Sequence, residues 1–281
     1  IISDIMVIRK KRKIKWKNVF LALFVLICLV GLGTSLFNII KWKIEAKTTN
    51  NQIETAQKVV KPVEIIDNDK IEIIEQEKVP LDNPYWEYVQ MNLIDVDFND
   101  LKNINPSTIG WIQVNGTNIN YPFVQTNDNK YYLNHSFNKS KNSAGWVFMD
   151  YRNNISVLDK NTIIYAHGRL DNTMFGSLKN ILTSGWLNNK NNYIVKLSTE
   201  YENNLWQVFS VYKIKTTNDY LQISFISNES FLEFTDKLIK RNDFNFNTKV
   251  NENDKILTLS TCYNEKEKVV LKKKKKKKVI K

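Results

Sequence analysis

Residues 19–40, VFLALFVLICLVGLGTSLFNII, form a run of 22 residues without a charged side chain. A helix of about 20 apolar residues spans the hydrocarbon core of a bilayer. The segment RKKRKIKWK, residues 9–17, lies immediately before the run and carries seven positive charges. Because Lys and Arg gather on the cytoplasmic side of membrane helices, the pattern predicts a cytoplasmic N-terminus over residues 1–18, a single transmembrane anchor over 19–40 and an extracytoplasmic remainder.

A cleaved signal peptide is the alternative interpretation of this run. Its apolar core would be shorter, and a site of small residues would follow it. Here the run is long and continues as KWKIEAK, so an uncleaved anchor is favoured. The first methionine is Met6, which predicts a start at that residue and five preceding residues that lie outside the protein.

The net charge of +12 resides at the two ends of the chain. Residues 9–17 and 272–278 carry seven positive charges each, and subtracting these fourteen from +12 leaves −2 for the remainder. Nucleic-acid binding requires a basic surface on the folded part of a protein. The charge distribution therefore argues against nucleic acid as a partner.

Residues 41–83 are rich in charge and free of glycine, which favours an extracytoplasmic stalk. From Pro84 onward, aromatic and β-branched runs alternate with Asn, Asp and Gly turn signals. The runs are GWIQV, TNINYPFV, GWVFMD, NTIIYAH, NYIVKL, LWQVFSVYKI and KILTLST. They predict a mostly β domain, built as a barrel or a sandwich.

Two helices are expected with these strands. The first covers residues 86–101 and ends before the terminator at Asn105 and Pro106. The second lies in SNESFLEFTDKLIKRN, residues 227–242, with Ser227 or Asn228 as its N-cap. Its apolar stripe consists of Phe231, Phe234, Leu238 and Ile239.

Cys262 and His167 each end a strand-like run. In a barrel the ends of two strands can converge even when the residues are distant in sequence. A nearby imidazole favours the nucleophilic thiolate and can protonate a departing amine. The pair therefore predicts a cysteine nucleophile with a histidine acid/base. The residues alone leave a second interpretation open, in which Cys262 is a small buried apolar residue and His167 a hydrogen-bonded histidine at a strand end.

The second histidine, His135, lies in the aromatic stretch YYLNHSFN and competes with His167 for the role of base. Two histidines and the one cysteine outside the apolar run match no closed zinc spacing. The sequence has no glycine-rich phosphate loop and no G-x-S-x-G motif. We therefore expect neither a metal nor a cofactor.

Several segments resemble class B sortases, a family of bacterial cysteine transpeptidases. TLSTC, residues 258–262, is similar to the active-site signature of the family. Residues 105–137, 143–153 and 161–181 resemble three further family segments in the same order, and the helix near 228–241 fits the helix inserted in class B. The resemblance implies a closed β-barrel of about eight strands, with an N-terminal helix and an inserted helix before the last strands.

The resemblance covers roughly residues 84–271 and implies a membrane-anchored enzyme that joins surface proteins to the cell wall. Cys262 would attack the carbonyl of a Thr in a C-terminal sorting signal and form a thioacyl-enzyme. His167 would be the acid/base, and an amine of a peptidoglycan precursor would resolve the intermediate. The implied partners are surface proteins with sorting signals, the peptidoglycan amine and the membrane around the N-terminal helix.

The family also has an arginine at the start of the strand after the cysteine, where it stabilises charge on the attacked oxygen. The last arginine of this chain is Arg241, and the matching position, immediately before VVL, is Lys268. Lysine supplies charge but not the rigid fork of a guanidinium. Either Lys268 partly replaces the arginine, or the activity is severely impaired.

The resemblance further implies a substrate-binding role for six residues, which are Asn129, Leu133, Thr216, Tyr220, Leu221 and Ser260. Core packing is the alternative for Leu133 and Tyr220. Asp150 is interpreted as a residue that stabilises a turn rather than as an acid catalyst. Two other functions stay open, a catalytically impaired peptide-binding protein of the membrane and a sortase that polymerises pilins.

The lysines at 272–278 conflict with a closing barrel strand, because inward-facing lysines would bury charge. One interpretation ends the strand near Leu271 and leaves 272–281 as a solvated tail. The other treats the run as an error in an A-rich reading frame, since VIK resumes a strand-like ending after it. The second interpretation is favoured.

Overall fold

The computed structural model describes residues 15–65, 72–73, 91–262 and 266–280. The chain divides into two compact units, Ile1–Ile44 and Glu45–Lys281. Helix α1 (Trp16–Val59) begins in the first unit and ends three residues before Pro62. By length and composition α1 is able to cross a membrane, and its apolar part contains the predicted anchor. Met6 and most of the basic segment lie outside the described residues.

The part of α1 from Glu45 onward belongs to the second unit and packs against its β-rich part. Thr49 and Ala56 are fully buried. Gln52 donates from Nε2 to Ser136 Oγ at 3.1 Å, and Gln57 donates to the carbonyl of Asn120 at 2.9 Å. The first part of the predicted stalk is therefore a helix held against the domain. Residues 66–71 and 74–83 of that stalk lie outside the described part of the chain.

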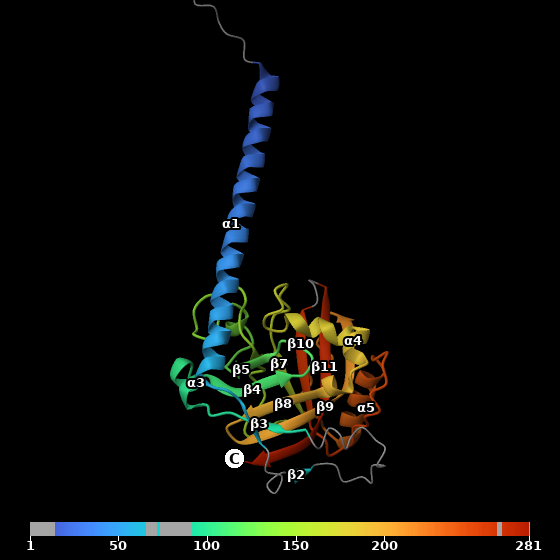
Figure 1. Ribbon diagram of the computed structural model, residues 1–281. Coiled ribbons are helices and arrows are strands. Elements are labelled where there is room, and N and C mark those ends of the chain that lie inside the picture. The colour runs from blue at the N-terminus through green and yellow to red at the C-terminus, as the bar shows by residue number, and fades with distance from the viewer. Residues whose placement is uncertain (1–14, 66–71, 74–90, 263–265, 281) are drawn as a thin grey trace, which may run out of the picture. The chain divides into compact units, whose positions relative to one another are not determined.

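Eight strands close into a mixed β-barrel in the order β10-β7-β6-β5-β4-β8-β9-β11, with β11 pairing back to β10 (Figure 1). The pairs β10–β7 and β5–β6 are parallel and the others are antiparallel. The strands are β4 (Thr108–Val114), β5 (Asn120–Val124), β6 (Phe148–Met149), β7 (Asn161–Tyr165), β8 (Ile194–Thr199), β9 (Glu202–Lys215), β10 (Ile256–Cys262) and β11 (Glu267–Ile280). The predicted closed barrel of about eight strands is confirmed.

Short elements complete the domain. β1 (Val63–Ile65) pairs with β3 (Leu93–Asp95), and β2 (Glu72–Ile73) adds to the far end of β11. The short helices are α3 (Asn99–Ile104), η2 (Tyr131–Leu133), η3 (Gly176–Leu182), α4 (Ser184–Leu187) and η4 (Lys190–Tyr193). The helix expected over 86–101 was wrong over residues 91–98, because Leu93 and Ile94 are buried in a strand whose partner comes from the predicted stalk, and only its last residues, 99–101, are helical, in α3.

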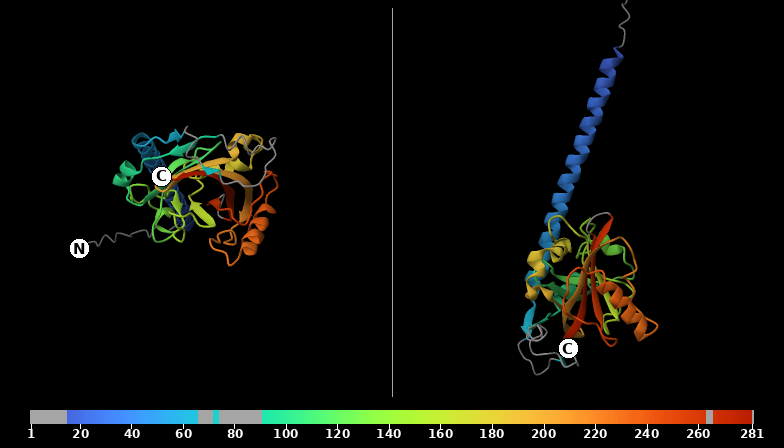
Figure 2. Two further views of the ribbon diagram at one scale, coloured as in Figure 1. Left: turned by 90° about the horizontal axis from the view of Figure 1, so that it is seen from below. Right: turned by 90° about the vertical axis from the view of Figure 1, so that its right-hand side faces the viewer.

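The inserted helix is confirmed as α5 (Asn228–Ile239). Ser227 caps it, and Ser230 completes a capping box. Phe231 and Leu238 are fully buried and pack in a cluster with apolar residues of β9, β10 and β11. The views in Figures 1 and 2 show α5 on the outside of the barrel beside these C-terminal strands. The last strands are therefore covered on both faces.

The lysine run belongs to strand β11, which pairs along its length with β9. Lys272–Lys276 are buried, so the interpretation of a solvated tail was wrong. The physical reason is that β9 has 14 residues and offers a long row of backbone donors and acceptors, which β11 satisfies. The interpretation as a reading-frame error is independent of this geometry and stays open.

Lys272, Lys274 and Lys275 have polar partners within the barrel. Lys272 donates to the carbonyl of Tyr220 at 2.9 Å and to Thr258 Oγ1 at 2.7 Å. Lys274 pairs with Asp254 at 2.9 Å, and Lys275 pairs with Glu202. Burial lowers the pKa of Lys275 to about 8 in spite of Glu202.

Lys273 differs from these three, because its Nζ is buried without a hydrogen-bond partner. Successive residues of a strand face opposite sides, so Lys273 lies on the same face of β11 as Leu271, which belongs to the main core. Val270 and Lys272 lie on the other face. Burial lowers the pKa of Lys273 well below its ordinary value. A buried amine without a hydrogen-bond partner is unfavourable, so this side chain lowers the stability of the barrel.

Candidate active site

His167 and Cys262 lie at the same end of two neighbouring strands. β7 and β10 are parallel, and their last paired residues are Tyr165 and Ser260. His167 and Cys262 each follow two residues later, at the same register position. For Cys262 the structure describes the backbone, which ends β10. The topology thus brings together two positions that are distant in sequence.

Lys268 lies on the other side of Cys262. β10 and β11 form an antiparallel hairpin in which Cys262 and Lys268 are direct Cα partners. Directly opposed residues in such a ladder lie about 4.5–5.5 Å apart. The register therefore puts a cationic side chain next to the position of the cysteine.

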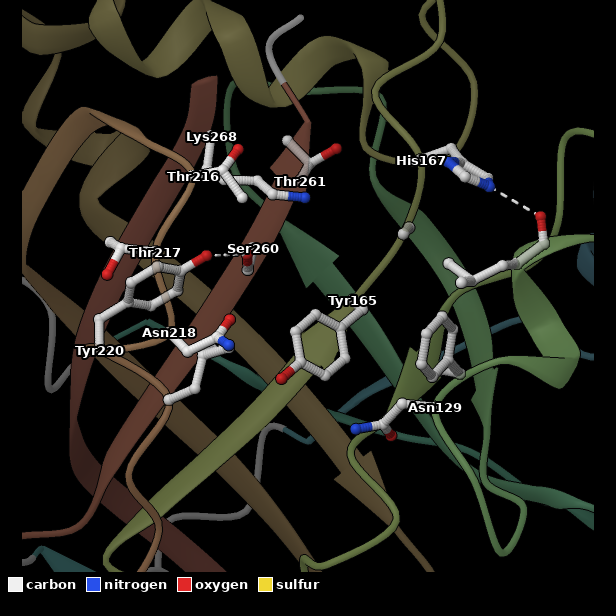
Figure 3. A pocket seen from close by; sticks show the side chains of 14 residues that line it. Asn129, Tyr165, His167, Thr216, Thr217, Asn218, Tyr220, Ser260, Thr261 and Lys268 are labelled. Atoms are coloured by element: carbon white, nitrogen blue, oxygen red, sulfur yellow. Dashed lines mark hydrogen bonds between the residues drawn. The ribbon is translucent and has the colours of Figure 1, made fainter. Parts of the chain in front are cut away.

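A cavity of about 270 Å³ opens at this end of the barrel (Figure 3). It is lined by His167, Lys268 and all six residues predicted to bind substrate, which are Asn129, Leu133, Thr216, Tyr220, Leu221 and Ser260. The other lining residues are Phe148, Tyr165, Ala166, Thr217, Asn218 and Thr261. Residues from six parts of the sequence thus meet in one pocket beside the end of β10.

The first wall of the pocket consists of Asn129, Leu133, Tyr165 and His167. His167 Nε2 lies 2.7 Å from the carbonyl oxygen of Leu133, as the dashed line in Figure 3 marks. A carbonyl only accepts, so Nε2 carries the proton and Nδ1 is the nitrogen left for proton exchange. Leu133 is 40% exposed, so the interpretation of Leu133 as a core residue was wrong.

The second wall is the loop of residues 216–221, which follows β9. The backbone N–H of Thr216 donates to the carbonyl of Lys266 at 2.9 Å. Tyr220 is buried, and its hydroxyl lies 2.8 Å from Ser260 Oγ. Tyr220 therefore both packs in the core and carries a hydrogen bond at the pocket.

Asp219 ties the second wall to helix α5 and to the turn that follows it. It pairs with Arg241 and with Lys237, the latter at 2.7 Å. Hydrogen bonds from Arg241, assisted by Lys237, lower the pKa of Asp219 to about 2. The loop is thus held by an ion pair that stays intact at any pH above about 4.

Sequence reasoning did not single out Tyr165, although a signal for it was present. Tyr165 and His167 are two residues apart at the end of β7, and alternate residues of a strand face the same side. The Tyr165 hydroxyl donates to Asp150 Oδ2 at 2.9 Å. Burial and the adjacent carboxylate raise the pKa of Tyr165 far above its ordinary value, so it acts as a neutral donor.

His135 does not line the pocket. Its ring stacks on Tyr131 with 4.0 Å between centroids, and its Nδ1 lies 2.8 Å from the carbonyl of Tyr131. These contacts are those of a structural histidine. Among the described residues no group of three or more His, Cys, Asp or Glu side chains is arranged to hold a metal ion.

Comparison with known proteins gives consistent matches. The family model described as a sortase domain matches residues 112–280. Sortase B of Listeria monocytogenes is 35% identical over 175 residues, which are 61% of this chain and 69% of the relative. Sortase B of Staphylococcus aureus is 34% identical over 184 residues, covering 66% and 75% of the two chains. The solved S. aureus sortase B-substrate complex matches with a TM-score of 0.60 at 35% identity, over 63% of this chain and 83% of that one.

Proposed function

The chain belongs to the sortase family, class B, and we propose that it acts as a membrane-anchored cysteine transpeptidase that cleaves a sorting signal after Thr. Surface proteins with such signals are the donor substrates, and an amine of a peptidoglycan precursor is the acceptor. Helix α1, which is long and apolar enough to cross a bilayer, supports attachment to the cell membrane. The basic segment before it supports a cytoplasmic N-terminus.

One observation carries the proposal. His167, Lys268 and six positions that match the substrate groove of the family line one cavity, beside the position where Cys262 ends β10. Neither the cavity nor the strand register depends on the resemblance. The S. aureus relative solved as a sortase B-substrate complex adds support for substrate binding by a protein of this fold.

In the first half-reaction the Cys262 thiolate attacks the carbonyl carbon of the threonine. A C–S bond forms, the carbonyl oxygen becomes an oxyanion, and the peptide C–N bond then breaks. The leaving amine takes a proton from the imidazolium of His167. The products are a thioacyl-enzyme and the released C-terminal fragment of the sorting signal.

In the second half-reaction the acceptor amine attacks the thioacyl carbon. It loses a proton to neutral His167, and the C–S bond breaks to regenerate the thiolate. Leu133 holds Nε2 of His167 by its carbonyl, so Nδ1 exchanges the proton in both steps. The net result is one peptide bond broken and one formed, with no cofactor consumed.

Lys268 supplies the positive charge for the oxyanion in both half-reactions. It stands where the family has an arginine, and a single ammonium cannot give the two parallel hydrogen bonds of a guanidinium. Loss of one oxyanion donor slows related reactions about 100- to 1,000-fold. We therefore expect a slow enzyme.

This replacement also favours a second candidate function, a sortase-shaped protein that binds peptides at the membrane without cleaving them. The two functions differ in their products. Full-length protein in detergent is incubated with a pool of fluorescein-labelled peptides that share a fixed central Thr, with and without triglycine as acceptor. Cleavage after Thr and a new Thr–Gly bond with triglycine are expected, and both must disappear in Cys262→Ala. Saturable binding of the pool without any product would support the second function.

A further inference from the structure

Asp150 is a fully buried carboxylate directly behind the first wall of the pocket. It does not line the cavity itself. Asn129 Nδ2 donates to its Oδ2 at 3.0 Å, and the Tyr165 hydroxyl donates to the same oxygen at 2.9 Å. Both donors are lining residues, so this one carboxylate fixes two side chains of the first wall.

Arg152 supplies the other hydrogen bonds to the Asp150 carboxylate. Its backbone N–H and its Nε donate to Oδ1 at 3.0 and 2.9 Å, and one terminal guanidinium nitrogen donates to Oδ2 at 2.8 Å. That same terminal nitrogen lies 3.2 Å from the carbonyl of Leu221, where it donates a second hydrogen bond. Leu221 belongs to the second wall, so a continuous chain of hydrogen bonds runs from one wall to the other.

We propose that Asp150 and Arg152 are positioning residues that set the distance between the two walls of the substrate pocket. This proposal rests on the proposed function of that pocket. The pair acts through Asn129, Tyr165 and Leu221 and does not touch the substrate. It is expected to control how tightly the peptide binds, and to leave the chemistry at Cys262 intact.

Asp150 is unsuited to acid catalysis. Burial by itself would raise its pKa, but the hydrogen bonds from Arg152 and Tyr165 outweigh burial and lower the pKa below its ordinary value. Five donors occupy the two oxygens, which leaves no room for a proton to be exchanged with substrate. The interpretation of Asp150 as a residue that stabilises a turn accounts for its hydrogen bonds with Arg152. It does not account for the hydrogen bonds from Asn129 and Tyr165, or for the link to Leu221 through Arg152.

The second wall keeps other attachments to the barrel when Arg152 is changed. Asn161 Nδ2 donates to the carbonyl of Gln222 at 2.7 Å, and the Tyr220 hydroxyl keeps its contact with Ser260. Asp219 keeps its ion pairs with α5. Loss of the Arg152 contact should therefore shift the wall without unfolding the domain.

The test compares Arg152→Gln and Asp150→Asn with the matched control Asp159→Asn, all in the full-length protein. Asp159 is a carboxylate in the same loop, where it accepts from the Asn153 amide and the Asn154 backbone at 2.8 Å and does not line the pocket. KM and kcat are measured with the Thr-centred peptide pool. We expect KM to rise about tenfold in both pair variants, as for loss of one charge-assisted hydrogen bond, with kcat changed less than twofold. Arg152→Lys, which keeps the charge but not both contacts, should recover only part of the affinity.

Hydrogen exchange of the backbone amides at 216–222 tests the pair without any peptide. Faster exchange is expected in Arg152→Gln and Asp150→Asn and unchanged exchange in Asp159→Asn. An unchanged KM together with unchanged exchange would overturn the proposal, as would a loss of kcat at constant KM. If the parent protein neither binds nor cleaves the pool, the proposed function fails, and the exchange measurement alone decides whether the pair spaces the walls.

Discussion

Cys262 and Lys268 are direct partners in the antiparallel ladder of β10 and β11, with Cys262 the last described residue of its strand. This pairing places Lys268, which we propose takes the role of the family arginine, beside Cys262. We therefore expect the rate of the proposed transpeptidation to depend strongly on the side chain at position 268.

Changing Lys268→Arg should raise the rate of peptide cleavage, because a guanidinium gives two oriented donors to the oxyanion. We expect a gain of about tenfold or more in kcat with the Thr-centred peptide pool. Lys213→Arg is the matched control, since Lys213 lies on neighbouring β9 and pairs with Glu267 instead of lining the pocket. A rate for Lys268→Arg that equals the parent's would refute the role given to Lys268.

Changing Lys273→Leu should stabilise the protein. The Nζ of Lys273 is buried without a hydrogen-bond partner, and an unpaired buried ammonium costs on the order of several kcal/mol. Thermal unfolding of the full chain in detergent should show a higher midpoint for this variant. Lys179→Leu, at an exposed lysine, should show almost none of that gain. Equal midpoints in Lys273→Leu and the parent would mean that the amine is solvated in solution.

The buried lysines also predict an unusual alkaline pH dependence. Burial lowers the pKa of Lys275 to about 8, against an ordinary value of 10.5, so the unfolded chain binds more protons than the folded protein between these pH values. Stability should therefore rise from pH 8 to about 9.5, below the range where unfolded tyrosines ionise. Unfolding midpoints at half-unit intervals measure this slope, which should be shallower in Lys275→Met. A flat or falling profile in the parent would contradict the burial of this strand.

The acid limit should involve Asp219. Its pKa is lowered to about 2 in the folded protein, so its contribution is fully present above about pH 4 and is lost as the pH falls toward 2. Because Asp219 holds the second wall on α5, the loop at 216–221 should loosen over that interval. Asp219→Asn should show the loosened loop already at pH 5, by faster hydrogen exchange at these residues. Identical exchange in variant and parent at pH 5 would show that Asp219 does not hold the loop at 216–221 in place.

The barrel, the inserted helix and the convergence of Cys262 with His167 were predictable from the sequence. Alternating β-branched runs mark strands, and ILTLST and NTIIYA each deliver a reactive side chain at a strand end. From the residues alone, the interpretation of Cys262 as a small buried apolar residue stayed open. The resemblance of several segments, in the same order, to the family favoured a nucleophile. The parallel register of β7 and β10 supplies the physical reason for their proximity.

Other features depend on long-range contacts that a local pattern does not contain. Leu93 and Ile94 form a strand because Val63–Ile65 lies beside them, although the surrounding sequence favours a helix. Lys272–Lys278 form a strand because they satisfy the backbone hydrogen-bonding groups of β9, in spite of the cost of burying lysine. The pair of Asp150 and Arg152 was visible in FMDYRN only as a turn, since its contacts to Asn129 and Leu221 are distant in sequence.

Mass spectrometry of Cys262 tests the transpeptidase mechanism most directly. The full-length protein is mixed with the Thr-centred peptide pool without an acceptor, quenched in acid and digested. We predict a thioacyl adduct on the peptide that contains Cys262, with the mass of the fragment ending in Thr, and its disappearance when triglycine is added before the quench. An unmodified Cys262 across the whole pool, in protein that still binds those peptides, would contradict the mechanism and leave a peptide-binding protein.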